Sequence, residues 1–320
     1  MENLELTDKG RGFLDEWLSD TPFVEARTSG STGKPKTIRL PKSDMRVSAR
    51  ATNRFFGINA ESLLVCPLSA DYIAGKMMIV RAIEAGCHLI MVEPTNHLEN
   101  IPPRIIAEYG TVSLLPLVPS QCESFINLKI DGSVRNVIVG GAPVSPETES
   151  RLADLDCAIW ATYGMTETCS HVAVRPMGSQ IYQGMPGVTF SADSQGKLDI
   201  TAPAYSFCRL QTNDIVEIVD SLHFRWLGRA DNVVNSGGIK IFPEELERQL
   251  AGLIPFQFYF KGEPDEKWGS RLVLVARCAE SEAARLAEIC RANLPHYSIP
   301  KEIRCVQDIP KTSNGKLRRL

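Results

Sequence analysis

The stretch Thr28-Ser29-Gly30-Ser31-Thr32-Gly33-Lys34-Pro35-Lys36 follows an extended segment and combines two glycines, four hydroxyls and two lysines. Glycine lets backbone N–H groups approach an anion closely, hydroxyls donate hydrogen bonds to it, and lysines neutralise its charge. The stretch therefore predicts a polyphosphate-binding loop. A Walker A loop is excluded, because only two residues separate the glycines and Pro35 stands where a helix would need an N–H. A solvated turn is the alternative interpretation of this composition.

The segment after this loop alternates between strand-like and helix-like patterns. Short apolar runs stand at residues 63–66, 88–92, 112–118 and 134–139, with helical patterns near residues 77–83 and 105–108. Buried strands that alternate with helices predict a largely parallel α/β sheet. A first amphipathic helix is expected before Pro22, since apolar residues recur there at helical spacing.

The pattern changes from about Val188 onward. Shorter alternating segments, such as residues 197–201 and 214–219, predict antiparallel β-structure. Residues 232–320 then mix helical patterns with strand-like runs, which predicts a small α+β domain. The expected fold class is α/β plus α+β. A large domain at residues 1–230, with a mainly parallel sheet followed by a small antiparallel β region, is joined by a hinge to a C-terminal α+β domain at residues 231–320.

The composition excludes several classes of protein. The 320 residues carry 35 basic and 38 acidic side chains, without the concentrated basic face that nucleic acid rewards. Nine cysteines include no C-x-x-C pair, so reduced thiols are expected rather than disulfides or a zinc site. The N-terminus lacks a signal-peptide pattern, and no apolar run approaches the roughly 18 residues of a membrane span. A cytoplasmic protein with no nucleic-acid partner and no membrane insertion is expected.

Five further motifs follow the loop in order along the chain. They are Gly140-Gly141-Ala142-Pro143, Ala161-Thr162-Tyr163-Gly164-Met165-Thr166-Glu167-Thr168, Asn213-Asp214, Gly228-Arg229-Ala230-Asp231 with Ser236-Gly237-Gly238, and Pro310-Lys311-Thr312-Ser313-Asn314-Gly315-Lys316. The first closes an apolar strand with a bend bare of side chains. The second places an aromatic ring, a hydroxyl and a carboxylate at a strand end, where ligands bind in open α/β sheets. In isolation, the glycine pair is an ordinary turn and the basic C-terminal run a solvated end.

This set of motifs, with the loop at residues 28–36, resembles the adenylate-forming superfamily, which includes acyl-CoA synthetases, luciferases and the adenylation domains of peptide synthetases. The resemblance extends from about Phe23 to Arg319. It implies an ATP-dependent acid–thiol ligase that activates a small carboxylic acid as an acyl-AMP and then forms an acyl-CoA thioester. ATP, Mg²⁺ and coenzyme A, the last as the thiol substrate, are therefore expected to bind.

The resemblance also implies roles for individual residues. Lys316 would bridge the substrate carboxylate and the α-phosphate, Thr166 would donate to that phosphate, and Glu167 would hold Mg²⁺, which prefers oxygen ligands. Tyr163 would stack on adenine, Asp214 would accept both ribose hydroxyls, and Arg229 would contact the nucleotide. The other nucleotide-binding residues expected are Thr28, Ser29, Gly30, Ser31, Thr32, Gly33, Lys34, Lys36, Gly140, Gly141, Ala142, Gly164 and Met165.

Two faces of the small domain are expected to act in turn, by the same resemblance. Asp231 would be the hinge, and Lys316 would serve only the first step. Ser236, Gly237 and Gly238 would give a pantetheine thiol access to the acyl-AMP in the second step. No cysteine of the protein is required as a nucleophile.

The chain departs from the family in three places. Only 27 residues precede Thr28, where most relatives carry a long N-terminal subdomain, so a truncated large domain is expected. The histidine common in the motif after the loop is replaced, and Tyr72 could line the acyl pocket or be a core aromatic. Asn213 stands where the family usually has glycine, and asparagine tolerates left-handed backbone angles better than other non-glycine residues.

Compact relatives of this kind include the o-succinylbenzoate-CoA ligases of menaquinone biosynthesis, which gives one hypothesis for the acid. An aryl- or short-chain acyl-CoA synthetase and an enzyme that loads a carrier protein are alternatives within the family. A nucleotide-binding protein that kept the fold and lost catalysis is the alternative of another class. The intact residues Thr166, Glu167, Asp214 and Lys316 count against it. A homodimer is left open as the assembly.

Overall fold

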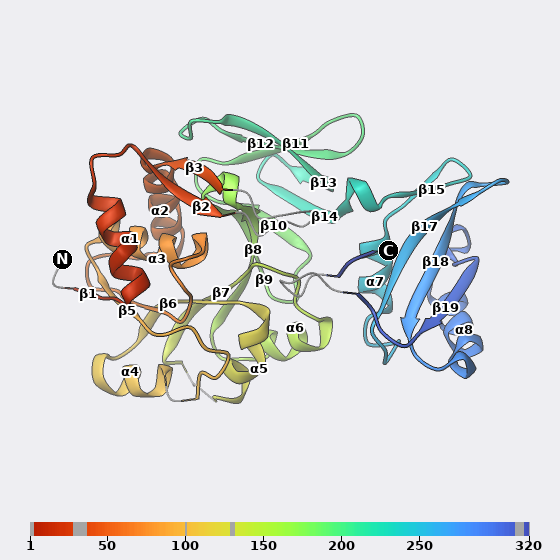
Figure 1. The fold of residues 1–320 in the computed structure, drawn as a ribbon, viewed down its shortest axis with the longest axis horizontal. Coiled ribbons are helices and arrows are strands. Elements are labelled where there is room, and N and C mark those ends of the chain that lie inside the picture. Colours follow the sequence, from red (N-terminus) through yellow and green to blue (C-terminus); the bar gives the residue numbers. More distant parts are fainter. Residues whose placement is uncertain (1–2, 28–36, 100, 129–131, 311–316, 320) are drawn as a thin grey trace.

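A single sheet of 12 strands dominates the computed structural model, which describes residues 3–27, 37–99, 101–128, 132–310 and 317–319 (Figure 1). A separate set of small sheets and two helices follows at the C-terminal end of the chain. None of the helices in these ranges is long and apolar enough to cross a bilayer.

One half of the large sheet is parallel. In spatial order its strands are β1 (Leu4–Glu5), β5 (His88–Met91), β4 (Leu63–Cys66), β6 (Val112–Leu117), β7 (Val134–Val139) and β8 (Ala158–Met165). One face is covered by α1 (Asp8–Leu18), α2 (Lys42–Phe56) and α3 (Ile73–Ala85), and the other by α4 (Pro102–Tyr109), α5 (Pro119–Asn127) and α6 (Pro146–Ala153) (Figure 1). Leu64 and Cys66 pack in the core on the first side, and Leu63 and Val65 in the core on the second. Strand residues alternate between faces, so this part of the chain is buried on both sides, as the apolar runs predict.

The other half is antiparallel and begins at β9 (Ser170–Pro176), after the 3₁₀ turn η1 (Thr166–Thr168). It continues in space through β10 (Ile181–Gly184), β14 (His223–Arg229), β13 (Cys208–Asp220), β12 (Lys197–Ala202) and β11 (Thr189–Ala192). A separate pair, β2 (Phe23–Arg27) and β3 (Thr37–Pro41), lies beside α2. The sequence places the start of antiparallel structure near Val188, and that boundary is wrong. The apolar run in β9 has the pattern of any buried strand, so it does not indicate strand direction.

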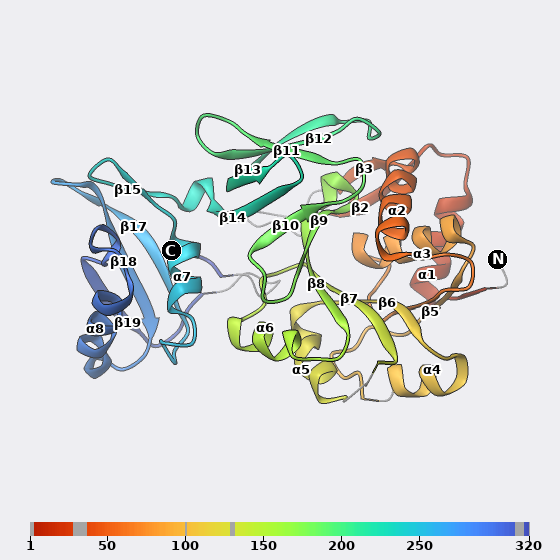
Figure 2. The same ribbon diagram turned by 180° about the vertical axis from the view of Figure 1, so that it is seen from behind.

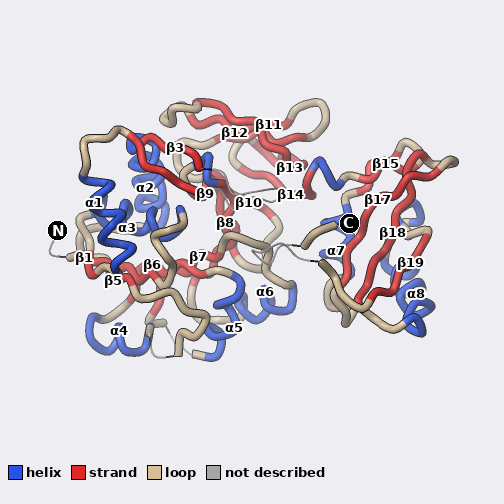
Figure 3. The backbone as a smooth tube through the Cα atoms, viewed as in Figure 1, coloured by secondary structure: helices blue, strands red, loops and turns tan. Residues whose placement is uncertain are grey.

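The C-terminal unit, defined here as residues 233–319, follows the 3₁₀ turn η2 (Ala230–Asn232). It contains the pair β15 (Val234–Ser236) and β16 (Ile239–Ile241), the helix α7 (Pro243–Leu250), and a sheet of β17 (Phe258–Asp265), β18 (Gly269–Arg277) and β19 (Glu302–Val306). The helix α8 (Ala283–Asn293) lies between the short turns η3 (Glu280–Glu282) and η4 (His296–Ser298). Figures 2 and 3 show α8 against this sheet, at the end of the molecule away from the N-terminus.

The C-terminal unit has a core of its own, to which α7, α8 and the three-stranded sheet contribute. Leu246, Phe260, Leu274 and Leu286 belong to it. The predicted fold class, a mainly parallel α/β sheet with an antiparallel region and a small α+β part, is thus confirmed. The division at residue 230 into two moving domains stays a prediction.

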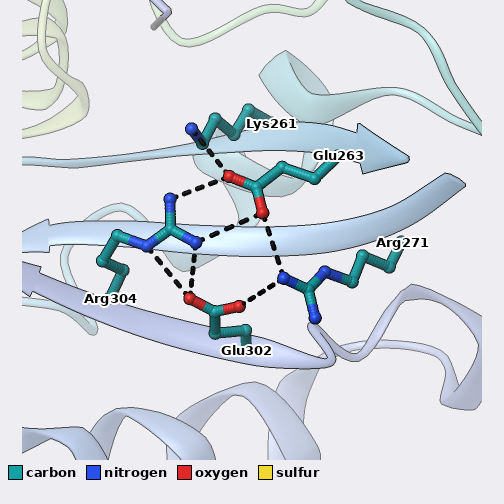
Figure 4. Close-up of polar contacts among 5 residues, drawn as sticks. All are labelled: Lys261, Glu263, Arg271, Glu302 and Arg304. Carbon is teal, nitrogen blue, oxygen red and sulfur yellow. Dashed lines mark hydrogen bonds and ion pairs between the residues drawn. The ribbon is translucent and has the colours of Figure 1, made fainter. Parts of the chain in front are cut away.

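The face of the small sheet opposite α8 carries a network of five charges (Figure 4). Glu263 accepts from Arg304 Nη1 at 2.8 Å, pairs with Lys261 at 2.9 Å, and pairs with Arg271 at 3.2 Å. Glu302 pairs with the same two arginines, at 2.6 Å from Arg304 and 2.8 Å from Arg271. Hydrogen bonds from Arg304 and Lys261 lower the pKa of Glu263 to about 2. The network ties together all three strands of the sheet.

Glu263 should make the stability of the small sheet depend on pH in the acid range. Because the pKa of its carboxyl is lowered on folding, its stabilisation is present above the unfolded value of about 4.3 and is lost as pH falls toward 2. Glu263→Gln should reduce stability at pH 7 by about 1 kcal/mol, the upper range for exposed ion pairs, and should weaken the dependence on pH below 4. Hydrogen exchange of β17 to β19 at pH 7, 4 and 3 would measure both effects. Glu266→Gln, on the exposed turn before β18, is the control and should behave like the unchanged protein.

Candidate active site

The predicted site residues fall into two groups. The phosphate loop at residues 28–36 and Lys316 lie outside the described residues, so their roles stay predictions. The motif at residues 140–142 follows β7, and the motif at residues 163–168 runs from the end of β8 into the η1 turn. Both lie at the carboxyl edge of the parallel strands. Open α/β sheets bind ligands at this edge. Asp214 and Arg229 come from β13 and β14, in the antiparallel half.

Tyr163 of β8 and Asp214 of β13 meet although three strands separate them in the sheet. The Tyr163 hydroxyl donates to Asp214 Oδ2 at 2.7 Å, so the antiparallel half must curl back toward β8. Trp226 Nε1 donates to Asp214 Oδ1 at 3.1 Å, and Arg229 Nη1 lies 3.5 Å from the same oxygen. Three motifs that lie far apart in the sequence are thus joined at one carboxylate.

The Asp214 carboxylate is nearly enclosed by these donors. Its side chain is only 8% exposed. Burial and the Asp214 charge raise the pKa of Tyr163 well above its usual value, so the phenol keeps its proton and donates. A carboxylate has about four acceptor positions. A ribose hydroxyl could therefore take the remaining position or replace Arg229, whose contact is the longest of the three.

The Tyr163 ring is also held from the side. It packs edge-on against Tyr182 and Phe224, with ring centres 5.7 and 5.2 Å away. Aromatic pairs favour such edge-to-face contacts, and these two fix the plane of the ring. Stacking on adenine stays a prediction.

The bend after β7 is shaped by a close approach to β8. A Cβ on Gly140 would overlap the Thr162 hydroxyl, which donates to the Val139 carbonyl oxygen at 3.1 Å. Gly141 has a φ of 89°, which side-chain-bearing residues rarely adopt. Glycine is therefore required at 140 by the Thr162 side chain and at 141 by the backbone angle, and the half-buried Ala142 follows in the same bend.

A strained turn connects β8 to β9. Gly164 has no room for a side chain, because a Cβ there would overlap the backbone of Ser170. Cys169 and Ser170 have φ values of 59° and 155°, in regions that non-glycine residues rarely populate. The Thr168 hydroxyl holds the turn by donating to the Ser170 carbonyl oxygen at 2.6 Å. Strain of this kind persists where surrounding contacts hold it, and it clusters at functional sites.

Thr166 and Glu167 occupy this turn, directly after Met165 at the end of β8. Thr166 is half-buried and Glu167 is exposed. Nowhere in the described ranges do three or more His, Cys, Asp or Glu side chains form a group that could hold a metal ion. Mg²⁺ commonly binds through one or two carboxylates, substrate phosphates and water. A single exposed carboxylate beside a nucleotide fits that ion, and does not fit a site built from protein ligands alone.

Arg81 of α3 is a buried cation behind the same turn. Its side chain is among the most enclosed in the core, with the residue 1% exposed. Its Nη2 donates to Ser170 Oγ at 3.0 Å, Nη1 lies 3.3 Å from Met78 Sδ, and Nε has no hydrogen-bond partner in the described structure. Burial lowers the pKa of Arg81 to about 10, so the guanidinium remains charged at neutral pH.

His171 lies beside Arg81 and is uncharged. Burial, reinforced by the Arg81 charge, lowers the pKa of His171 well below its usual value. Its ring nitrogens face hydroxyls instead of carboxylates, with Thr52 Oγ1 at 3.2 Å and Ser170 Oγ at 3.4 Å. A buried charge without a counter-ion is costly, so Arg81 is a candidate partner for an anionic group of a ligand.

The predicted thiol face lies on the C-terminal unit. Ser236 ends β15, and Gly237 and Gly238 form the exposed turn to β16 with φ values of 60° and 84°. The Gly237 N–H donates to the Trp268 carbonyl oxygen at 2.8 Å, and a Cβ on Gly237 would lie 2.9 Å from the Trp268 ring. Glycine is therefore required here both by conformation and by the indole beside it.

Trp268 presents a partly exposed aromatic surface next to this turn. The residue is 40% exposed. The ammonium groups of Lys267 and Lys301 lie 5.0 and 5.7 Å from the centre of its ring. An aromatic face between two cations suits a base that carries phosphates.

Tyr72 lies directly before α3 and is 61% exposed. It is therefore not a core aromatic, which removes one of the two interpretations of this residue. Its role in an acyl pocket stays a prediction. Gly75, one turn later, packs so closely on the Ser69 carbonyl that a side chain would not fit.

Comparison with known families identifies the fold and its class of enzyme. The family model described as AMP-binding enzyme matches residues 19–197, more than half of the chain. The chain belongs to the AMP-binding enzyme family. The model described as AMP-binding enzyme C-terminal domain matches residues 259–316 of this AMP-binding enzyme. The predicted adenylate-forming superfamily is thus confirmed.

Curated relatives of this AMP-binding enzyme include acid–thiol ligases. It is 28% identical over 336 residues to a 2-succinylbenzoate–CoA ligase of Listeria monocytogenes, covering 96% of this chain and 70% of the relative. It is 25% identical to a 3,4-dihydroxybenzoate–[aryl-carrier protein] ligase of Bacillus anthracis, covering 95% of this chain and 74% of the relative. The chain therefore spans about 70% of the length of these relatives.

Solved structures give the same fold. An acyl-CoA synthetase (AMP-forming)/AMP-acid ligase II-like protein from Dyadobacter fermentans is 33% identical, with a TM-score of 0.65, covering 97% of this chain and 91% of its own. The o-succinylbenzoate CoA synthetase from Bacillus subtilis, in complex with an acyl-adenylate, is 20% identical with a TM-score of 0.78. The match covers 92% of this chain and 67% of the synthetase. The second likeness concerns the fold alone.

Three candidate residues of the AMP-binding enzyme were not found from its sequence. Arg81 is a single cation within an otherwise apolar helix segment, and that isolation is a signal that could have singled it out. Trp226 lies in an ordinary alternating strand, and Trp268 in a turn between strands. Neither tryptophan has a local pattern that distinguishes it from a packing residue.

Asp214→Asn should weaken AMP binding by tenfold or more, because a hydrogen bond to a charged group contributes about 1.5–3 kcal/mol. Tyr163→Phe should have a smaller effect, about threefold, since Trp226 would still orient the carboxylate. Titration calorimetry with AMP measures both affinities, and circular dichroism checks that each variant folds. Asp220→Asn, at the exposed end of the same strand, is the control. Equal AMP affinities of Asp214→Asn and Asp220→Asn would show that Asp214 does not contribute to nucleotide binding.

Proposed function

We propose that this chain is an AMP-forming acid–thiol ligase that activates a carboxylic acid with ATP and transfers the acyl group to coenzyme A. The observation that carries the proposal is the junction of Tyr163, Asp214 and Arg229 at one buried carboxylate. It lies beside the strained turn that holds Thr166 and Glu167. Membership of the AMP-binding enzyme family supports the same activity.

In the first step the substrate carboxylate attacks the α-phosphorus of ATP, and pyrophosphate leaves. Negative charge grows on the phosphoryl oxygens, and preorganised donors stabilise it best. Thr166 would donate to the α-phosphate, and Asp214 would fix the ribose through its hydroxyls. Mg²⁺, when bound at Glu167 with the phosphates, supplies charge neutralisation. The predicted roles of Lys316 and the loop at residues 28–36, on the acyl oxygen and the departing pyrophosphate, belong to the same step.

In the second step the thiol sulfur attacks the acyl carbon, the acyl–phosphate bond breaks, and AMP leaves. Gly237 and Gly238 would let the pantetheine arm approach the backbone, since a turn without side chains leaves room for it. Trp268, with Lys267 and Lys301, would hold the base and phosphates of coenzyme A. A pantetheine arm attached to a carrier protein has no adenine. An aromatic surface for adenine therefore favours coenzyme A over a carrier protein as the thiol substrate.

We propose 2-succinylbenzoate as the acid, which would place the enzyme in menaquinone biosynthesis. That compound carries two carboxylates, and activation consumes only one of them. The second needs a counter-charge. The Arg81 guanidinium has no carboxylate partner in the described structure and would supply one after a rearrangement that opens access to it, because the residue is only 1% exposed here. The curated 2-succinylbenzoate–CoA ligases among the relatives support the same choice.

A second candidate is an enzyme that activates an aromatic acid and loads it onto a carrier protein. The relative from Bacillus anthracis, named for an aryl-carrier protein, favours it. The two candidates differ in the thiol and in the need for a second carboxylate. A cytoplasmic location and a homodimeric assembly stay predictions.

ATP–pyrophosphate exchange over a panel of acids tests the function and the substrate together. The panel holds 2-succinylbenzoate, benzoate, 3,4-dihydroxybenzoate and short-chain acids. We expect the highest kcat/KM for exchange with 2-succinylbenzoate. A separate assay of thioester formation with the same acid should then show coenzyme A as a better acceptor than pantetheine alone. Tight ATP binding without exchange for any acid would favour the non-catalytic nucleotide-binding protein.

Arg81→Met separates substrate recognition from folding. Replacing a buried charge with an apolar side chain of similar length is often neutral for stability. The variant should raise KM for 2-succinylbenzoate by about ten- to a hundredfold, the scale of a lost charge-assisted pair, and leave exchange with benzoate unchanged. Equal losses for both acids, in a protein of unchanged melting temperature, would contradict the role given to Arg81.

A further inference from the structure

We propose that Asn213 is a positioning residue that holds the C-terminal unit in the orientation seen here, and so sets how readily the enzyme passes from the first half-reaction to the second. This inference rests on the proposed ligase function and on a hinge at Asp231. Asn213 directly precedes Asp214, a residue of the proposed nucleotide site.

The contact joins the antiparallel half of the sheet to the hinge turn. Asn213 Nδ2 donates to Asp231 Oδ2 at 2.6 Å, whereas Arg229 Nη2 lies 3.9 Å from the same carboxylate oxygen. Asp231 is 64% exposed and stands in the middle of η2. A rotation about the N–Cα bond of Asp231, or about any bond before it in the turn, moves the Asp231 carboxylate relative to β13 and breaks the short bond.

Asn213 also neighbours the buried carboxylate of the nucleotide site. Successive residues of a strand point to opposite faces, so Asn213 faces the hinge while Asp214 faces Tyr163 and Trp226. Arg229 spans the two carboxylates, with one Nη 3.5 Å from Asp214 and the other 3.9 Å from Asp231. A nucleotide that takes the Arg229 position on Asp214 would leave Asn213 as the remaining short link to the hinge.

The orientation seen here is not the one expected for thiol transfer. The Gly237 N–H donates to the Trp268 carbonyl oxygen in the turn between β17 and β18, and Figures 1 and 2 show that turn at the end of the molecule far from β8. Transfer instead requires the glycine turn to face the acyl-AMP. A bond that favours this orientation therefore favours the state that precedes transfer. Its removal should shift the population toward the thiol-transfer state.

Other contacts between β14 and α7 share this task. Arg248 Nη2 donates to the Trp226 carbonyl oxygen at 2.9 Å, and Arg225 pairs with Glu245 at 3.1 Å. Loss of Asn213 alone should therefore change the populations by a modest factor and should not abolish activity. We expect about three- to fivefold, which corresponds to roughly 0.7–1 kcal/mol.

The first measurement uses the ligand-free enzyme and needs no catalysis. Trypsin cleavage after Arg229, followed by mass spectrometry, reports how often the hinge turn opens. Asn213→Ala should raise the cleavage rate at this bond about three- to fivefold and leave cleavage elsewhere unchanged. Asn293→Ala, which removes an exposed amide that donates to the Ile289 carbonyl in α8, is the matched control and should leave the hinge rate unchanged.

The second measurement separates the half-reactions. Asn213→Ala should lower the rate of acyl-AMP formation and leave thioester formation from supplied acyl-AMP equal or faster. Asn213→Asp, which places two carboxylates in contact, should have a larger effect. The double change Asn213→Asp with Asp231→Asn restores an amide–carboxylate pair with exchanged roles and should recover hinge protection relative to Asn213→Asp.

These outcomes distinguish the inference from the function on which it rests. Unchanged hinge cleavage in Asn213→Ala, equal loss in both half-reactions, or no recovery in the double variant would each overturn it. If the enzyme catalyses no exchange with any acid, the proposed function fails, while the cleavage experiment still decides whether Asn213 holds the hinge.

Discussion

The buried carboxylate of Asp214 on β13 binds side chains from β8 and β14, and this contact determines how the sheet must fold around the nucleotide site. Asp214 accepts from Tyr163 on β8 and Trp226 on β14, so the sheet has to reverse direction after β8 and curl until β13 returns to it. The reversal is made in a short turn in which Gly164 has no room for a Cβ and Cys169 and Ser170 take strained angles. Strain at this point is offset by the packing of the cores on either side.

Asp214 and Arg81 are both buried charged residues, but among the described residues only Asp214 has hydrogen-bond partners that offset its burial. Asp214 is buried but satisfied by donors, which is the usual condition for an interior carboxylate. Arg81 is buried without a carboxylate in the described structure, and its neighbours are a hydroxyl, a thioether and a neutral imidazole. A buried charge without a counter-ion is costly. The role proposed for Arg81, as the partner of an anionic group of the substrate, would offset this cost when the substrate is bound.

The sequence predicted the fold class, and the family resemblance predicted that Tyr163, Asp214 and Arg229 lie at one nucleotide. The local patterns did not indicate how these residues meet. The apolar runs at residues 63–66, 112–117 and 134–139 indicated buried parallel strands. A strand that is covered on both faces needs apolar side chains at every position, so it appears as a continuous apolar run. The sequence also predicted a bend without side chains after β7. In the structure the Thr162 hydroxyl leaves no space for a side chain at Gly140. The joining of Tyr163 to Asp214 follows from the curl of the sheet, which local patterns do not encode. Arg81, Trp226 and Trp268 gain their significance from neighbours distant in sequence.

Tyr163, Asp214 and Arg229 are proposed to form one nucleotide site. Hydrogen exchange of the whole chain, measured by mass spectrometry with and without saturating AMP, tests it most directly. We expect slower exchange with AMP in two separate segments, residues 162–170 and 212–231, since both contribute to the same carboxylate cluster. Protection of only one of these segments, or protection confined to other parts of the chain, would contradict it.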